Sequence, residues 1–301
     1  MIRQVTAVLV AVAACVCSSA AASAATGPVL GATTAPNNYP GATTYADAAR
    51  RFDAATGTPM ALQAAKRYLG PSQWPSTVGP AFRRGVHYLI TLKPGFYRDR
   101  RLPPARTQDQ ITQMIGFVRM LKAAGITADY ALDNEPSDNL RAFPTPAAYR
   151  AWFNYYAKPL AARGVPVVYD AAGWRPALAV AYYPGDRYVR KVVEDFYASA
   201  YWNRRHARLA PVAALADHHK PNPVPFGVAE WGWTAGRPVT LTQFRQYAAY
   251  ITSFFTARQR AGKRSCYLIW WNGGGPNTVR GSSDPKAPII ARVYATLSAR
   301  G

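Results

Sequence analysis

The segment ADYALDNEP, residues 128–136, decides the fold because it joins a short apolar run to a cluster of polar residues. A second segment of the same kind, PFGVAEWGW, occupies residues 225–233. Runs of roughly four to eight apolar, β-branched or aromatic residues bounded by turn residues are typical of buried strands. Longer helical patterns separate such runs along most of the chain, and this alternation predicts a parallel α/β fold.

Eight strands and the helices between them are predicted from this pattern. Several helices have start signals, as at Thr107 and Thr240, and several end in glycine, as at Gly125. The predicted strands are residues 29–34, 65–69, 86–92, 128–133, 166–169, 193–200, 225–230 and 266–272. The predicted helices are residues 45–55, a short piece near 78–84, 107–124, 146–163, 176–180 with 187–191, 204–219, 241–261 and 287–299.

Eight such units indicate a single-domain (β/α)8 barrel, the TIM-barrel architecture. Each unit takes about 35 residues, and a barrel of this kind needs about 250 residues plus loops. The alternative is a doubly wound α/β sheet, which usually carries a glycine-rich phosphate loop after the first strand. The segment GATTAP at residues 31–36 is not such a loop, so we expect the barrel.

The N-terminus resembles a secretory signal peptide. A positive start at residues 1–3 precedes an apolar run at residues 5–17, and Ala22-Ser23-Ala24 suits signal peptidase. We therefore expect residues 1–24 to be removed and residues 25–301 to form the secreted domain, with no integral membrane segment after processing. The alternative is a lipobox, Val12-Ala13-Ala14-Cys15, which would leave the protein lipid-anchored through Cys15.

Composition and charge limit the function classes. Hydrophobic residues make up 49% of the 301 residues, so the chain can build a large core and is not a disordered or fibrous protein. With 36 basic and 15 acidic residues, the formal net charge is +21. Such a surplus favours anionic partners. After removal of the signal peptide Cys266 is the one remaining cysteine, which excludes an intrachain disulfide and a thiol-based zinc cluster.

Two of the chain's three glutamates follow predicted strands. Glu135 ends the fourth strand and Glu230 ends the seventh, whereas Glu194 lies inside the sixth. Barrel active sites lie at the carboxyl ends of the strands, so both acids are expected at the same mouth. Paired carboxylates are what glycosidic bond cleavage needs: one donates a proton to the departing oxygen, and the other attacks the anomeric carbon or activates water. Taken singly, Glu135 could instead be a helix-start acid and Glu230 a partner of an arginine.

The segments Asn134-Glu135-Pro136 and Ala229-Glu230-Trp231-Gly232 resemble clan A of the glycoside hydrolases, and within it family 26-like β-mannanases and related endo-glycanases. The segment Asp133-Asn134-Glu135 departs from the His-Glu pair that is usual in those enzymes. The resemblance implies a retaining enzyme with Glu135 as general acid/base and Glu230 as nucleophile. It also implies that Asn134 hydrogen-bonds the sugar 2-hydroxyl and that Tyr201 positions the nucleophile, a place that Tyr197 or Trp202 could take instead.

Aromatic and basic residues at the strand ends complete the predicted substrate site. Sugar rings stack on indole, and we expect such contacts from Trp202, Trp231, Trp233 and the pair Trp270 and Trp271, of which one ring should face the site and the other pack under a helix. Arg98 and Arg175 follow the third and fifth strands. Guanidinium groups bind carboxylate, sulfate or phosphate, which favours an anionic glycan as the substrate. The alternative is that these arginines only reflect the general arginine richness of the chain.

Other chemistries lack their motifs. The four histidines have no metal-ligand spacing, no serine-esterase elbow is present, and Gly273-Gly274-Gly275 has no phosphate-binding helix start behind it. We therefore expect no cofactor, no metal and no nucleic acid, and a monomeric enzyme that acts on oligo- or polysaccharide. The alternative hypothesis is a barrel that binds cell-wall or extracellular glycan without turnover.

Overall fold

A computed structural model describes residues 27–59, 63–69, 79, 81–95, 105–198, 209–233, 239–272 and 277–299. Within these residues the chain forms eight strands, seven α-helices and one short 3-10 helix, η1 (Pro36–Asn38). The strands are β1 (Val29–Thr34), β2 (Ala64–Leu69), β3 (His87–Leu92), β4 (Thr127–Leu132), β5 (Val167–Ala172), β6 (Val189–Ala198), β7 (Phe226–Trp233) and β8 (Ser265–Asn272). The helices are α1 (Tyr45–Thr56), α2 (Gln108–Ala123), α3 (Pro146–Ala161), α4 (Pro176–Tyr182), α5 (Ala210–Asp217), α6 (Leu241–Arg260) and α7 (Ala287–Ser298).

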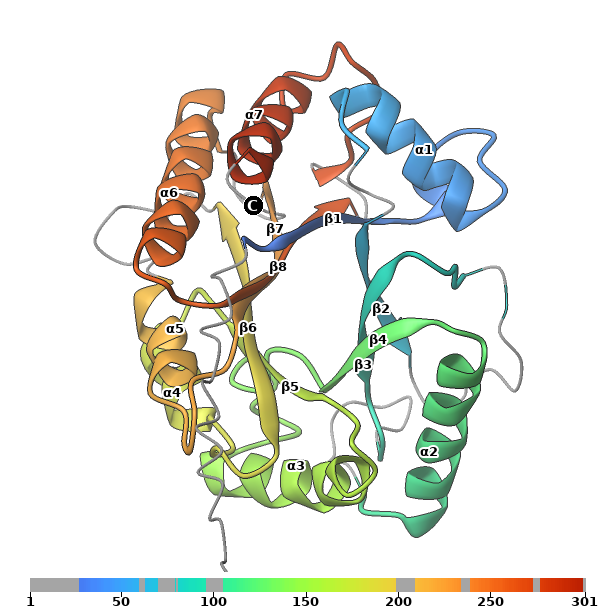
Figure 1. The fold of residues 1–301 in the computed structure, drawn as a ribbon, viewed down its shortest axis with the longest axis vertical. Coiled ribbons are helices and arrows are strands. Elements are labelled where there is room, and N and C mark those ends of the chain that lie inside the picture. The colour runs from blue at the N-terminus through green and yellow to red at the C-terminus, as the bar shows by residue number, and fades with distance from the viewer. Residues whose placement is uncertain are drawn as a thin grey trace, which may run out of the picture.

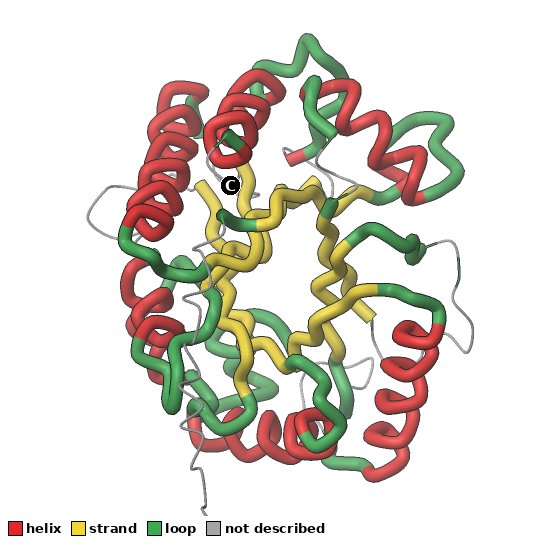
Figure 2. The backbone as a smooth tube through the Cα atoms, viewed as in Figure 1, coloured by secondary structure: helices red, strands yellow, loops and turns green. Residues whose placement is uncertain are grey.

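The strands form an inner ring that the helices surround, which confirms the predicted single-domain (β/α)8 barrel (Figure 1). Every paired strand is parallel to its neighbour, in the order β1-β8-β7-β6-β5-β4-β3-β2. Figure 2 shows the helices outside the ring. The barrel is nearly closed between β1 and β2, where the Thr33 hydroxyl accepts from the Lys66 amide at 3.1 Å. Gly31 permits this approach, since a Cβ there would lie 2.2 Å from the Ala64 carbonyl oxygen.

Three predicted helical pieces differ from the structure. Residues 187–191 do not form a helix, because β6 begins at Val189, and Lys191 reaches Asp129 inside the barrel. The piece near residues 78–84 is not helical at the positions that the structure describes. The helix expected over residues 204–219 is shorter, at Ala210–Asp217, and residues 204–208 lie outside the described residues.

The barrel interior is filled in layers. At the amino-terminal end of the strands, Asp129 is contacted by His87 at 3.0 Å, by Lys191 and by the Tyr267 hydroxyl. Burial acts to raise the pKa of Asp129, but these three partners lower it below its usual value. Above this layer lie buried apolar side chains that include Leu89, Ala131, Val168, Val193, Ala229 and Ile269. The apolar layer separates Asp129 from a second set of charged side chains near the carboxyl ends.

The predicted signal peptide and the lipobox alternative at Cys15 lie outside the described residues. In the part of the chain that the structure describes, no helix is long and apolar enough to span a membrane. Cys266 is buried inside the barrel, and burial raises the pKa of its thiol to about 12.

Candidate active site

A β-bulge in β7 directs Glu230 into the barrel. The pairing of β6 with β7 runs from Glu194 and Val228 to Asp195 and Glu230, so β7 carries one extra residue, Ala229. Strict alternation would place Ala229 inside and Glu230 outside. The bulge brings both inside, and bulges of this kind commonly redirect a side chain next to an active site.

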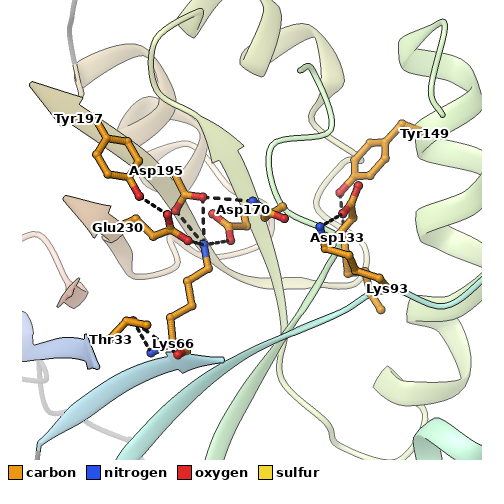
Figure 3. Close-up of polar contacts among 11 residues, drawn as sticks. Thr33, Lys66, Lys93, Asp133, Tyr149, Asp170, Asp195, Tyr197 and Glu230 are labelled. Carbon is orange, nitrogen blue, oxygen red and sulfur yellow. Dashed lines mark hydrogen bonds and ion pairs between the residues drawn. The ribbon is translucent and has the colours of Figure 1, made fainter. Parts of the chain in front are cut away.

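Lys66 lies at the centre of the charged side chains near the carboxyl ends of the strands. Its side chain is fully buried, and its ammonium nitrogen lies 2.7 Å from Asp170, 2.8 Å from Asp195 and 2.9 Å from Glu230 (Figure 3). The lysine comes from β2, and the acids come from β5, β6 and β7. One buried ammonium thus faces three carboxyl groups, which counters part of the cost of burying them.

Tyr197 is the tyrosine that contacts Glu230. Its hydroxyl donates to Glu230 Oε2, as Figure 3 shows, and it projects from β6 on the same side as Asp195. Of the three aromatic residues that the resemblance offered for this place, Tyr197 has the contact, whereas Tyr201 and Trp202 lie outside the described residues. Glu230 is therefore held by Lys66 at one oxygen and by Tyr197 at the other.

Glu135 sits on a strained turn at the end of β4. Asp133 and Glu135 have φ of 58° and 49°, and no other described residue except glycine has positive φ. Left-handed backbone at such residues costs about 1–3 kcal/mol each and clusters at functional sites. The turn is fixed by backbone hydrogen bonds: Asp133 N–H donates to the Leu92 carbonyl at 2.8 Å, and Glu135 N–H donates to the Asp170 carbonyl at 3.0 Å.

The two residues before Glu135 face different partners. Asp133 pairs with Lys93 at 3.2 Å. The amide nitrogen of Asn134 lies 3.5 Å from Asp195, and Asn134 Oδ1 is a buried atom with no hydrogen-bond partner among the described residues. A free acceptor at this position suits a ligand hydroxyl.

Different neighbouring groups set the pKa values of Glu135 and Glu230. Burial, and then the neighbouring Asp195 and Asp138 carboxylates, raise the pKa of Glu135 to about 9, so the acid keeps its proton at neutral pH. Burial also raises the pKa of Glu230, but the Lys66 ammonium and its hydrogen bond act in the opposite direction. Burial likewise raises the pKa of Asp170 and of Asp195, again with Lys66 opposing.

The predicted sugar contact of Trp231 is wrong, and Trp270 is the ring of its pair that packs under a helix. Trp231 and Trp270 are completely buried and contact each other edge to face at 4.9 Å between ring centres. Trp231 also stacks on Phe244 of α6. The β7 bulge explains the error for Trp231, because it turns Glu230 inward and the next residue outward. Neither ring is available to a substrate.

Two other predicted tryptophans, Trp233 and Trp271, are partly exposed. Trp271 lies on the opposite side of β8 from Trp270, as expected for the pair, and meets Tyr68 edge to face at 5.7 Å. Trp233 packs against Phe244 at 5.1 Å, on the helix side. Of these, Trp271 is the ring on the barrel side.

A further tryptophan at the mouth is Trp174, in the β5–α4 loop. Its side chain is 55% exposed, its indole N–H donates to Asp138, and the Arg175 guanidinium lies 4.0 Å from its ring centre. Asp138 belongs to the Glu135 loop, since its N–H donates to the Glu135 carbonyl at 2.8 Å. Trp174 and Arg175 are therefore joined to the loop that carries Glu135. Arg98 lies outside the described residues.

Sequence reasoning also missed Lys66, Asp170 and Asp195. Lys66 and Asp195 lie inside predicted strands and Asp170 directly follows one, and a charged residue in a strand usually marks the solvent face. The available signal was a lysine in the otherwise apolar start of β2 together with an aspartate in each of two strands. Among the described residues, no group of three or more histidine, cysteine, aspartate or glutamate side chains is placed to hold a metal ion.

Glu194, the third glutamate, is fully buried on the outer side of β6, and neither carboxyl oxygen has a hydrogen-bond partner among the described residues. Burial, and then Asp195, raise its pKa well above the usual value. As pH rises above the ordinary glutamate range, the unfolded chain loses this proton and the folded chain keeps it, so stability falls by about 1.4 kcal/mol per pH unit. We expect Glu194→Gln to remove that slope and to be the more stable protein at pH 7.

Urea unfolding of both proteins between pH 5 and pH 8 measures this effect. The stability difference in favour of Glu194→Gln should grow with pH. A difference that stays constant over this range would show that Glu194 ionises in the folded protein.

The chain is a (β/α)8 barrel with one acid after β4 and another on β7, and its fold is similar to that of clan A retaining glycoside hydrolases. Solved structures of that clan share this fold with the chain at low sequence identity. A Bacillus subtilis mannanase, BCman, is 17% identical, with a TM-score of 0.51 over 88% of this chain and 86% of its own.

Two other solved structures extend the comparison. A family 39 β-xylosidase from Caulobacter crescentus is 14% identical, with a TM-score of 0.55 over 90% of this chain and 72% of its own. Gas2 of Saccharomyces cerevisiae is also 14% identical, with a TM-score of 0.54 over 90% of this chain and 64% of its own. No protein-family model and no curated protein sequence matches the chain.

Proposed function

We propose that the protein is a secreted retaining glycoside hydrolase that cleaves a polysaccharide by double displacement. The observation that carries the proposal is the unequal setting of two acids at one barrel mouth. Glu135 keeps its proton at neutral pH, and Glu230 is held by a lysine and a tyrosine. Neighbours of the same fold include a mannanase and a β-xylosidase, which supports a glycosidic substrate.

In the first half of the reaction, Glu230 attacks the anomeric carbon while Glu135 donates its proton to the leaving oxygen. This step yields a glycosyl–enzyme ester and a free alcohol. In the second half, Glu135, now ionised, removes a proton from water, which displaces Glu230 and restores both acids. Lys66 and Tyr197 orient the Glu230 carboxylate, and their donated hydrogen bonds favour its ionised form.

The mouth also supports a contact with an anionic sugar. Trp174 offers an exposed indole, and Arg175 lies against that ring, so a sugar on this platform would have a guanidinium within reach of a carboxylate, sulfate or phosphate group. The chain's net charge of +21 favours such a polymer.

A panel of neutral and acidic polysaccharides, incubated with purified protein that lacks residues 1–24, tests the proposal. We expect reducing ends to be released from at least one polymer, and NMR of the first product should show the anomeric configuration of the substrate. An inverted product would exclude the covalent route. Binding without any release of reducing ends, from a panel that includes mannan, xylan and β-glucan, would favour the rival, a barrel that only binds glycan.

The plot of kcat/KM against pH should be bell-shaped. Both of its limbs should lie at higher pH than those of an enzyme whose two catalytic carboxyl groups have ordinary pKa values. Activity requires protonated Glu135, so it should fall as pH rises through about 9. It also requires ionised Glu230, whose pKa burial raises, so the acid limb should lie above the usual glutamate range. Initial rates between pH 4 and pH 10 measure both limbs, and an alkaline limb near pH 5 would contradict the state assigned to Glu135.

A further inference from the structure

A basic groove of about 500 Å³ lies on the face of the barrel opposite the active site. It is formed where β6, β7 and β8 begin, by residues 186–187, 190–191, 219–225 and Arg264. Glu135 and Glu230 lie at the other ends of the strands, so the groove is separate from the mouth.

The cations of the groove are available to a ligand. Arg187, Lys220 and Arg264 are exposed, and none of their side chains contacts a carboxylate among the described residues. Asp186 is the one acid among the described lining residues, and its oxygens already accept from the Tyr183 hydroxyl at 2.8 Å and from the Lys220 N–H at 3.0 Å. The groove therefore has an uncompensated positive charge, which attracts oxyanions.

A buried imidazole in the same groove lacks one partner. His219 is only 4% exposed, and its Nδ1 lies 3.0 Å from the Asn222 carbonyl oxygen, which can only accept, so Nδ1 carries the proton. Nε2 of the neutral ring is then an acceptor, and it has no hydrogen-bond partner among the described residues. A buried acceptor without a partner is costly, and a ligand hydroxyl would satisfy it.

We propose that this groove is a second binding site, for an acidic polysaccharide, with its cations on the anionic groups and His219 Nε2 accepting from a sugar hydroxyl. The combination of free cations and a hydroxyl acceptor matches a polymer that carries both groups on each residue. The described lining residues include no phenylalanine, tyrosine or tryptophan on which a nucleic-acid base could stack. The choice of a polysaccharide rests on the proposed function, whereas the anion site does not. Such a site would hold the enzyme on its polymer away from the mouth.

Affinity electrophoresis of the protein lacking residues 1–24 tests the site, with polygalacturonate and dextran sulfate as acidic probes and dextran as the neutral one. The groove variant is Arg187→Ser with Lys220→Ser and Arg264→Ser. The matched control removes three exposed arginines elsewhere: Arg119→Ser on α2, Arg245→Ser on α6 and Arg292→Ser on α7. Loss of three local ion pairs should weaken acidic binding about tenfold, and the control should weaken it by less than about twofold. The two acidic probes distinguish carboxylate from sulfate as the preferred anion.

His219→Asn is the second variant, because the asparagine amide can still donate to Asn222 while Nε2 is removed. It should weaken binding to the acidic polysaccharide and leave binding to a duplex DNA oligomer unchanged. If the groove variant and the control variant lost the same affinity for the acidic probes, the binding would be a diffuse effect of net charge and the proposed site would be overturned. Binding to DNA as tight as to both polysaccharides, with no effect of His219→Asn, would overturn the polysaccharide assignment. Both readouts are binding measurements, so they stand even if no hydrolysis is found.

Discussion

Glu230→Gln should abolish turnover while leaving the protein folded. Glutamine keeps the shape of the side chain: its carbonyl oxygen can accept from Lys66 while its amide N–H donates to the Tyr197 hydroxyl, and Lys66 keeps its ion pairs with Asp170 and Asp195. The amide cannot attack the anomeric carbon, so the covalent step has no substitute. We expect kcat on the polysaccharide to fall by at least about 10⁴-fold, the scale of loss when a covalent nucleophile is removed.

Glu194→Gln is the matched control for this measurement. It makes the same chemical change at the chain's third glutamate, which lies on the outer side of β6 and whose carboxyl oxygens have no hydrogen-bond partner among the described residues. Its kcat should remain close to that of the unmodified protein. Hydrolysis by Glu230→Gln at an undiminished rate would exclude Glu230 as nucleophile, and equal losses in both variants would assign the effect to the fold.

The fold was predictable because its signals are local and repeated. Apolar runs such as the one before Asp133 and start signals such as Thr240, which forms a capping box with Gln243, depend on neighbours in sequence. The two glutamates were also predictable, because glutamate is rare in this chain and both acids follow strands.

The rest of the site depends on geometry that alternation does not reveal. The bulge at Ala229 reverses the faces of Glu230 and Trp231, and for this reason Trp231 was wrongly placed in the substrate site. From the sequence alone, Lys66 would be predicted to lie on the surface. It is buried because the barrel brings β2 opposite β5, β6 and β7. The left-handed backbone at Asp133 and Glu135 has no sequence signal either, since neither residue is glycine.

Glu135→Ala should give a loss that depends on the leaving group. On the natural polymer, an unprotonated alkoxide is a poor leaving group, so removal of the proton donor should lower kcat by about 10²–10⁴-fold. Aryl glycosides with acidic phenols need little protonation, so formation of the glycosyl–enzyme should survive far better with them. Stopped-flow release of the phenol would then show a burst, because the second step lacks its base and becomes rate-limiting.

Added azide separates the role of Glu135 from that of Glu230. A small anion needs no base to attack the glycosyl–enzyme, and it can enter the space that the shortened side chain leaves, so azide should restore turnover of the aryl glycoside and yield a glycosyl azide of retained configuration. In Glu230→Ala no glycosyl–enzyme forms, and azide could react only by replacing the nucleophile directly, which gives the inverted azide. The raised pKa of Glu135 and the donors on Glu230 motivate this assignment. Equal losses on activated and natural substrates for Glu135→Ala would defeat it, and a retained azide product from Glu230→Ala would reverse the two roles.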